Sequence, residues 1–303
     1  MDAADRTGKN RAADEAGGRR EGRKARIAVI YFPGNNCEEE TMVAIRTAGM
    51  EPSLFRWNED PETLEKFDGY VLPGGWAYED RVRAGAIAAK EPIVEQIRKE
   101  AAKGKPVLGI CNGFQVLAES GMLPGLGTAG KGTAQGTHRA SFALAPNRNP
   151  FICGYYCTWI RVKVSAGKRN AFNRFLKEGQ VIRMPIAHGE GRLVSKDHTL
   201  AARLVEKGQV MFRYCDVKGN ISEDFPVNPN GAEQNIAAIC NSEGNVMGMM
   251  PHPERANFMR QLPGMQEGWE EAEAAGPGRP IFGSMREYIE ERQGAEGNPG
   301  EGP

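Results

Sequence analysis

Cys111 stands between two glycines in the run Gly109-Ile-Cys-Asn-Gly113. The apolar run 107–110 before it favours a buried strand, and the apolar run 114–118 after it favours a helix. A cysteine on such a strand-to-helix turn is typical of a nucleophile elbow, in which flanking glycines admit neighbouring backbone. The helix N-terminus favours the thiolate. We therefore predict that Cys111 is a nucleophile; the alternative is a buried packing cysteine.

A cysteine nucleophile needs a base that takes up its proton and returns it to the leaving group. The chain has four histidines: His138, His188, His198 and His252. His252 follows an apolar strand-like run, and Pro253 favours an extended backbone at His252. Since residues two apart in extended chain point to the same side, Glu254 can orient the ring. We predict that His252 and Glu254 act together; the alternative is an ordinary polar loop.

A third feature, Pro73-Gly-Gly75, also directly follows a predicted strand. Backbone amides without Cβ crowding can point at a developing oxyanion. We expect the amides of Gly75 and Asn112 to form an oxyanion hole, an assignment that depends on Cys111 being the nucleophile.

Short β-rich runs alternate with helical patterns on both sides of these motifs. We expect strands over 27–32, 53–57, 70–72, 107–110, 158–164, 181–187, 209–214, 236–240 and 246–250. We expect helices over 38–48, 92–101, 114–118 and 280–291, and a hairpin turn over 241–245. The pattern predicts an α/β fold: a mostly parallel twisted sheet with helices on both faces and an added antiparallel portion.

The two ends of the chain differ in composition from its middle. Residues 2–26 contain no Leu, Ile, Val, Phe or Met, and the last dozen residues are similarly poor in apolar side chains. Such segments cannot bury enough surface to offset the entropy of ordering. We therefore expect a disordered leader over 1–25, one domain over 26–292 and a disordered tail over 293–303.

The composition narrows the classes of partner. Thirty-nine basic residues balance thirty-nine acidic ones, so no net field favours nucleic acid or an anionic membrane. No apolar run is long enough for a membrane helix, and no signal peptide is evident. We expect a cytoplasmic protein whose six cysteines are reduced. Cys153 and Cys157 have no closed zinc spacing, so no metal site is expected.

Longer stretches around these motifs carry a family resemblance. They are Phe32-Pro-Gly-Asn-Asn-Cys37, Pro73-Gly-Gly-Trp-Ala-Tyr78, Arg83-Ala-Gly-Ala-Ile-Ala88, Gly109-Ile-Cys-Asn-Gly-Phe-Gln115, Ala187-His-Gly-Glu-Gly191 and Gly248-Met-Met-Pro-His-Pro-Glu-Arg255. Together they resemble class I (triad) glutamine amidotransferases, and among these the glutaminase subunits of phosphoribosylformylglycinamidine synthase, a purine-pathway family. The resemblance covers about residues 26–292.

The resemblance implies a reaction and its partners. Cys111 would attack the side-chain amide of L-glutamine, His252 would carry the proton, and a thioester would be hydrolysed after ammonia leaves. Gln115 would help to hold the substrate. Ammonia would pass to a large ATP-dependent synthetase subunit, often accompanied by a small third subunit. No cofactor is expected in this chain, since ATP and Mg²⁺ would belong to the synthetase.

Some positions depart from the family pattern. Trp76 and Ala77 stand where Phe and Ser are expected, and Glu79 stands where glycine is common. These changes leave the triad intact but affect the loop that carries the oxyanion amide. The segment 125–141 also lacks close resemblance. Within it, Gly125 to Gly132 nearly spells a phosphate-binding loop but lacks the hydroxyl residue after the lysine, so nucleotide binding is not expected.

Two further groups could carry chemistry. Cys37 also follows a predicted strand, but no paired glycines frame it, and we expect a structural role near the partner surface. His188 and Glu190 repeat the spacing of His252 and Glu254, and could form a second acid–base pair or belong to the interface.

Two alternatives remain for the whole chain. A cysteine peptidase or deglycase on a related fold would ignore glutamine. A catalytically silent regulatory subunit would only bind its synthase, although the intact Cys111, His252 and Glu254 argue against silence.

Overall fold

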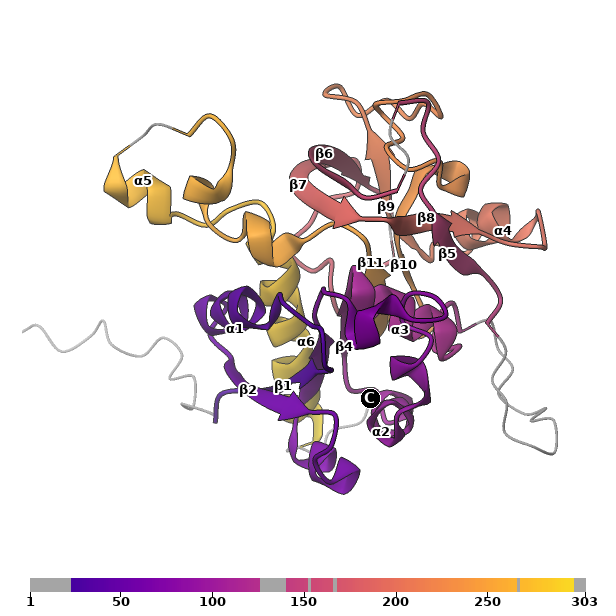
Figure 1. Ribbon diagram of the computed structural model, residues 1–303. Helices are drawn as coiled ribbons and strands as arrows, with labels where there is room; N and C mark the ends of the chain where they lie inside the picture. Colours follow the sequence, from indigo (N-terminus) through magenta and orange to yellow (C-terminus); the bar gives the residue numbers. More distant parts are fainter. Residues whose placement is uncertain (1–22, 126–139, 152–153, 166–167, 266–267, 297–303) are drawn as a thin grey trace, which may run out of the picture.

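The computed structural model describes residues 23–125, 140–151, 154–165, 168–265 and 268–296 (Figure 1). Its centre is a nine-stranded sheet in the order β2-β1-β3-β4-β11-β10-β9-β6-β7. The first five strands of this order are parallel. Their bounds are Glu51–Arg56 (β2), Arg26–Tyr31 (β1), Gly69–Leu72 (β3), Val107–Ile110 (β4) and Val246–Met249 (β11).

The remaining four strands continue the sheet in antiparallel fashion. They are Ile236–Cys240 (β10), Val210–Cys215 (β9), Tyr156–Val164 (β6) and Val181–His188 (β7). A separate antiparallel pair consists of Ala143–Pro146 (β5) and Glu190–Val194 (β8). The sheet therefore has a parallel half and an antiparallel half, joined where β11 meets β10.

Helices cover both faces of the parallel half. Glu38–Thr47 (α1) and Arg279–Glu296 (α6) lie on one side of the strands, and Pro92–Ala102 (α2) and Asn112–Glu119 (α3) lie on the other (Figure 1). Two shorter helices, Leu200–Glu206 (α4) and Trp269–Glu273 (α5), lie outside these layers. The 3₁₀ segments are Pro61–Lys66 (η1), Ala77–Asp80 (η2), Ala88–Lys90 (η3), Glu233–Asn235 (η4), Pro253–Ala256 (η5) and Met259–Gln261 (η6).

The burial pattern explains why these segments form a covered sheet. All four residues of β3, of β4 and of β11 are buried, as expected for parallel strands with helices on both faces. On α2, the apolar residues Ile93, Val94 and Ile97 are buried on one face. The continuous apolar runs in the sequence therefore belong to β4 and to the strands β3 and β11 on either side of it.

The structure confirms the predicted fold class. The predicted strands and helices are present with bounds shifted by a few residues, and the predicted turn over 241–245 joins β10 to β11. The pair β5–β8 and the helices α4 and α5 were not predicted. Helix α6 continues to Glu296, past the predicted domain end at residue 292. Residues 1–22 and 297–303, to which most of the predicted leader and tail belong, lie outside the described residues. Within the described part, no helix is long and apolar enough to cross a membrane.

Candidate active site

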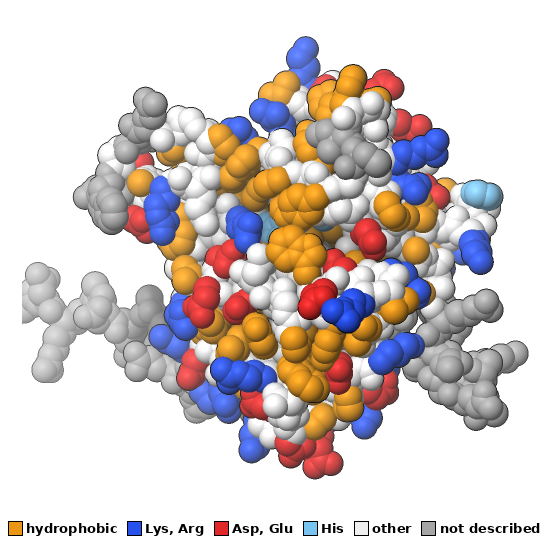
Figure 2. Space-filling model, in the orientation of Figure 1, with side chains coloured by type: hydrophobic (Ala, Val, Ile, Leu, Met, Phe, Trp, Pro, Cys, Tyr) orange, Lys and Arg blue, Asp and Glu red, His pale blue; other side chains and the backbone are white. Residues whose placement is uncertain are grey.

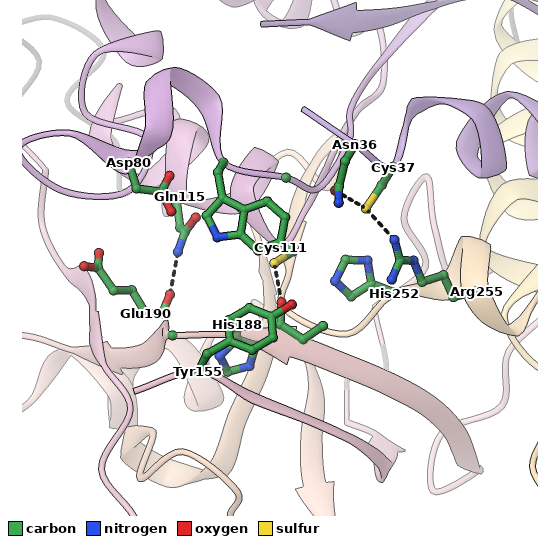
Figure 3. A pocket seen from close by; sticks show the side chains of 14 residues that line it. Asn36, Cys37, Asp80, Cys111, Gln115, Tyr155, His188, Glu190, His252 and Arg255 are labelled. Carbon is green, nitrogen blue, oxygen red and sulfur yellow. Dashed lines mark hydrogen bonds between the residues drawn. The ribbon is translucent and has the colours of Figure 1, made fainter. Parts of the chain in front are cut away.

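A cavity of about 170 Å³ lies at the carboxyl edge of the parallel strands. The segments that follow β1, β3, β4 and β11 reach it from one half of the sheet, and the end of β7 reaches it from the other. In Figure 3, Cys111 lies between two groups of side chains. Asp80, Gln115 and Glu190 lie on one side of it, and Cys37, His252 and Arg255 lie on the other.

The backbone at Cys111 has the strained geometry of a nucleophile elbow. Cys111 has φ 50° and ψ −104°, and it caps the N-terminus of α3. A Cβ on Gly113 would lie 2.0 Å from the carbonyl oxygen of Leu72, and a Cβ on Gly109 would lie 2.7 Å from that of Gly113. Both glycines are therefore required by close backbone contacts. Strain of this kind costs about 1–3 kcal/mol and persists where the surrounding packing enforces it.

His252 and Glu254 form a buried pair beside Cys111. The His252 Nδ1 atom lies 2.6 Å from Glu254 Oε1, and the two residues are 2% and 1% exposed. Burial disfavours the imidazolium, but the carboxylate of Glu254 and the thiols of Cys111 and Cys37 outweigh it, and the pKa of His252 is raised well above its ordinary value. Because Nδ1 is engaged by Glu254, Nε2 is the ring atom left for proton transfer.

The loop after β3 brings Gly75 to the cavity. Residues Asn35 and Gly75 form a bridge whose hydrogen bonds are donated by the amides of Asn36 and Trp76, so the Gly75 amide takes no part in it. A Cβ on Gly75 would lie 2.5 Å from the Cα of Asn35, and its φ of 145° also requires glycine. Asn112 is the first residue of α3, where a backbone amide has no acceptor within the helix.

The side chain of Asn112 organises the end of the cavity that lies across from His252 (Figure 3). Its amide group donates to Asp80 Oδ1 at 3.1 Å and to Gln115 Oε1 at 2.9 Å, and its oxygen accepts from the amide of Ala77. Gln115 in turn donates to the carbonyl oxygen of Glu190 at 2.6 Å. These bonds hold the Asp80 carboxylate, the Gln115 amide and the backbone of Glu190 around one end of the cavity (Figure 3).

Asp80 and Glu190 form an acidic pair. Burial, and secondly the charge of Glu190, raise the pKa of Asp80 to about 6, against an ordinary value of 3.8. Asp80 belongs to a segment with unusual backbone, because Tyr78, Glu79 and Asp80 have φ of 56°, 60° and 51°. Glycine adopts such angles more readily than the residues at these three positions do. The cavity therefore has an anionic end, which no sequence motif indicated directly.

His188 does not pair with Glu190. Its Nδ1 lies 3.0 Å from Asn147 Oδ1, whereas a Glu190 oxygen accepts from the amide of Ala84. Burial, with a smaller effect of His252, lowers the pKa of His188 to about 3. The ring is therefore neutral at ordinary pH, and the predicted second acid–base pair is not formed.

Cys37, for which a structural role near the partner surface is expected from the sequence, lines the cavity. Its thiol donates to Asn36 Oδ1 and accepts a hydrogen bond from Arg255 Nη2 at 3.2 Å. A Cβ on Gly74 would lie 2.8 Å from the His252 ring and 3.0 Å from the Cys37 sulfur, so glycine at this position lets the two side chains approach. Sequence reasoning missed this proximity.

Two aromatic rings lie at the mouth of the cavity. Trp76, from the loop after β3, and Tyr155, just before β6, are stacked with ring centroids 5.9 Å apart. Both remain exposed, at 42% and 49%. Hydrophobic side chains gather at the centre of this face of the molecule (Figure 2). The rings therefore narrow the entrance from both halves of the sheet.

Two other predicted features fall partly outside the described residues. The near-match to a phosphate-binding loop begins at Gly125, and the rest of it lies outside the described residues. The cysteine at position 153 also lies outside them. Cys157 is exposed on β6.

Comparison with known proteins places the chain among amidotransferases. A family model described as a CobB/CobQ-like glutamine amidotransferase domain matches residues 24–289. The phosphoribosylformylglycinamidine synthase subunit PurQ of Methanothrix thermoacetophila is 52% identical over 274 residues, covering 88% of this chain and 99% of its own. That of Pyrococcus furiosus is 44% identical over 232 residues, covering 77% and 89%.

Solved structures agree. A chain of PurLQS from Thermotoga maritima matches with a TM-score of 0.66 at 31% identity, covering 88% of this chain and all of its own. The glutaminase domain of CTPS from Trypanosoma brucei, with a TM-score of 0.51 at 11% identity, covers 88% of this chain and 94% of its own, and it shares the fold. The chain therefore belongs to the PurQ family of glutamine amidotransferases.

Proposed function

We propose that this chain is the glutaminase subunit of phosphoribosylformylglycinamidine synthase in purine biosynthesis. It hydrolyses glutamine to glutamate and ammonia and delivers the ammonia to an ATP-dependent synthetase. The observation that carries this proposal is the cavity in which Cys111, on its strained turn, meets His252, whose Nδ1 is hydrogen-bonded to Glu254. Membership of the PurQ family supports the choice of substrate and pathway.

The geometry supports a thioester mechanism. The raised pKa of His252 favours an imidazolium beside a Cys111 thiolate, the reactive form of a cysteine nucleophile. The thiolate attacks the side-chain carbonyl carbon of glutamine, and the amides of Gly75 and Asn112 stabilise the oxyanion. His252 gives its Nε2 proton to the leaving ammonia and then activates the water that hydrolyses the thioester. Glu254 holds the ring and stabilises its charged form.

The anionic end of the cavity orients the substrate. Glutamine carries an α-ammonium group that a carboxylate pair can bind, and Asp80 and Glu190 lie across the cavity from His252 (Figure 3). Gln115 lies between this pair and Cys111 and supplies an amide to the substrate. With the ammonium bound there, the side-chain amide points toward Cys111.

A protein partner completes the reaction. By the family resemblance, the synthetase would hold ATP and Mg²⁺ and receive the ammonia, and a small third subunit would complete the complex. Free ammonia is mostly protonated and non-nucleophilic near neutral pH, so transfer inside a complex preserves its reactivity. The exposed rings of Trp76 and Tyr155 place an apolar surface at the cavity mouth, where such a partner would dock.

The cavity argues against the peptidase alternative. Its volume of about 170 Å³ is below the roughly 300–1,000 Å³ of ordinary ligand sites and suits a single amino acid better than a polypeptide. A deglycase or a silent subunit would leave the acidic pair without a role.

The test is glutamate formation by the purified chain, with and without the synthetase. We expect activity that rises with the partner and is abolished in Cys111→Ala. Glu79→Gln, a change on an exposed side chain of a neighbouring loop, serves as the matched control. If wild type forms no glutamate even with the partner, the proposed function is wrong.

A further inference from the structure

The segment that carries Asp80 has backbone angles that its residues rarely adopt. Tyr78, Glu79, Asp80 and Val82 have φ of 56°, 60°, 51° and 73°. Left-handed backbone is disfavoured for residues other than glycine, and most strongly for a β-branched residue such as valine. Residues 78–82 include no glycine, so each of these four positions is strained. We call residues 78–84 the strap.

Contacts anchor the strap at both of its ends. The Tyr78 hydroxyl donates to Glu91 Oε1 at 2.6 Å, and the Tyr78 amide donates to the carbonyl oxygen of Pro33 at 2.7 Å. At the other end, Ala84 is buried, and its amide donates to Glu190 Oε2 at 3.2 Å. One carboxylate of the anionic end therefore belongs to the strap, and the other is bound by the strap's backbone.

The middle of the strap is held less firmly than its ends. The side chains of Glu79 and Arg81 pair with each other and are 74% and 71% exposed, and Val82 is 86% exposed. Strained backbone persists where the surrounding structure enforces it, and exposed side chains contribute little packing of this kind. Burial, and secondly the charge of Glu190, disfavour the charged form of Asp80, whose pKa is raised to about 6. A cation bound between the two carboxylates would therefore favour the strained arrangement.

We propose that the strap has two states and that the ammonium group of glutamine selects between them. In the closed state, Asp80 lines the cavity opposite Cys111 and completes the ammonium site (Figure 3). In the open state, the strained residues return to ordinary backbone angles and Asp80 withdraws. Without glutamine the open state is the more populated, so closing the strap lowers the apparent affinity for glutamine. The choice of glutamine rests on the proposed function, whereas the two states of the strap do not.

Substitutions of Val82 test the strap from outside the catalytic cavity, which this residue does not line. Val82→Gly removes the side chain and the backbone strain, whereas the matched control Val82→Ala shortens the side chain and keeps the strain. Neither variant changes a charge. Val82→Gly should lower KM for glutamine about 5-fold relative to Val82→Ala, with kcat changed little, because closing the strap becomes easier. The assay is glutamate formation by the full-length proteins with the synthetase present. Equal KM values in the two variants would overturn the proposal.

Amide hydrogen exchange tests the strap without activity. In full-length Cys111→Ala, which cannot form a thioester, saturating glutamine should slow exchange over residues 78–84 at least about 5-fold, with α2 as the internal reference. Without glutamine, exchange there should be slower in Val82→Gly than in Val82→Ala. Equal exchange in these two variants means that the strap has one state, and the proposal is wrong. If wild type forms no glutamate even with the synthetase, the proposed function fails, but the comparison of the two variants still decides whether the strap opens.

Discussion

Replacing Asp80 with asparagine removes one of the two carboxylates at the anionic end of the cavity. The substitution keeps an oxygen for the side-chain amide of Asn112, which lies 3.1 Å away, so the local geometry is preserved. A hydrogen bond to a charged group contributes about 1.5–3 kcal/mol. Loss of one such bond to the α-ammonium of glutamine should therefore raise KM by about 10- to 150-fold, with kcat changed little.

The pH dependence gives an independent check. The pKa of Asp80 is raised to about 6, so the carboxylate gains a proton as the pH falls through 6. Only the charged form attracts an ammonium group. In wild type, kcat/KM for glutamine should therefore fall below pH 6, and at pH 5 about 90% of Asp80 is protonated. Asp80→Asn should lose this step, because asparagine does not titrate.

The assay is steady-state glutamate formation by wild type and Asp80→Asn from pH 5 to 8. Glu79→Gln is the matched control, because it removes one negative charge from the same loop, where its side chain is 74% exposed and pairs with Arg81. Folding places Asp80 where its charged form is disfavoured, so Asp80→Asn should melt no lower than wild type at pH 7. An unchanged KM together with a persistent step near pH 6 would refute the ammonium site.

Two further substitutions test the geometry around the nucleophile. Glu254→Gln should lower kcat by about 10²- to 10⁴-fold and shift the pH profile, because it removes the charge that stabilises the His252 imidazolium; a profile identical to wild type would contradict this role. Gly113→Ala should destabilise the fold by more than about 2 kcal/mol, measured by denaturant unfolding, because its Cβ would lie 2.0 Å from the Leu72 oxygen. Gly294→Ala, an exposed helical position with open space around the added Cβ, is the control and should be neutral or slightly stabilising.

The parts of the fold that the sequence predicted are those with strong local signals. The strand over 107–110 is apolar throughout because both faces of β4 are covered, and paired glycines mark the turn after it. The pairing of His252 with Glu254 was predicted from extended backbone, but only His252 is extended, because the 3₁₀ segment η5 begins at Pro253. The 3₁₀ turn still places the Glu254 carboxylate beside the His252 ring. In these cases, the chemistry of a few neighbouring residues determines the local structure.

The remaining parts depend on contacts between distant segments. Asp80 reaches the cavity through three consecutive residues with positive φ, none of them glycine, so no residue type marks the turn. The approach of Cys37 to His252 depends on how the ends of β1 and β11 are arranged across the sheet. His188 and Glu190 have the spacing of a catalytic pair, but Asn147, from a different segment, binds the histidine. Tertiary contacts decide these outcomes.

The pairing of β4 with β11 has a consequence for synthesis of the chain. Strand β4, which immediately precedes Cys111, pairs with β11, which is synthesised much later. His252 and Glu254 are synthesised after β11. A ribosome-bound chain that ends before β11 has the proposed nucleophile but neither the proposed base nor the neighbouring strand. The Cys111 thiol is therefore without its proposed proton acceptor while residues 112–251 are synthesised. On the proposed mechanism, we expect glutamine breakdown to begin only when β11 has been inserted into the sheet, so an unfinished chain should release no ammonia.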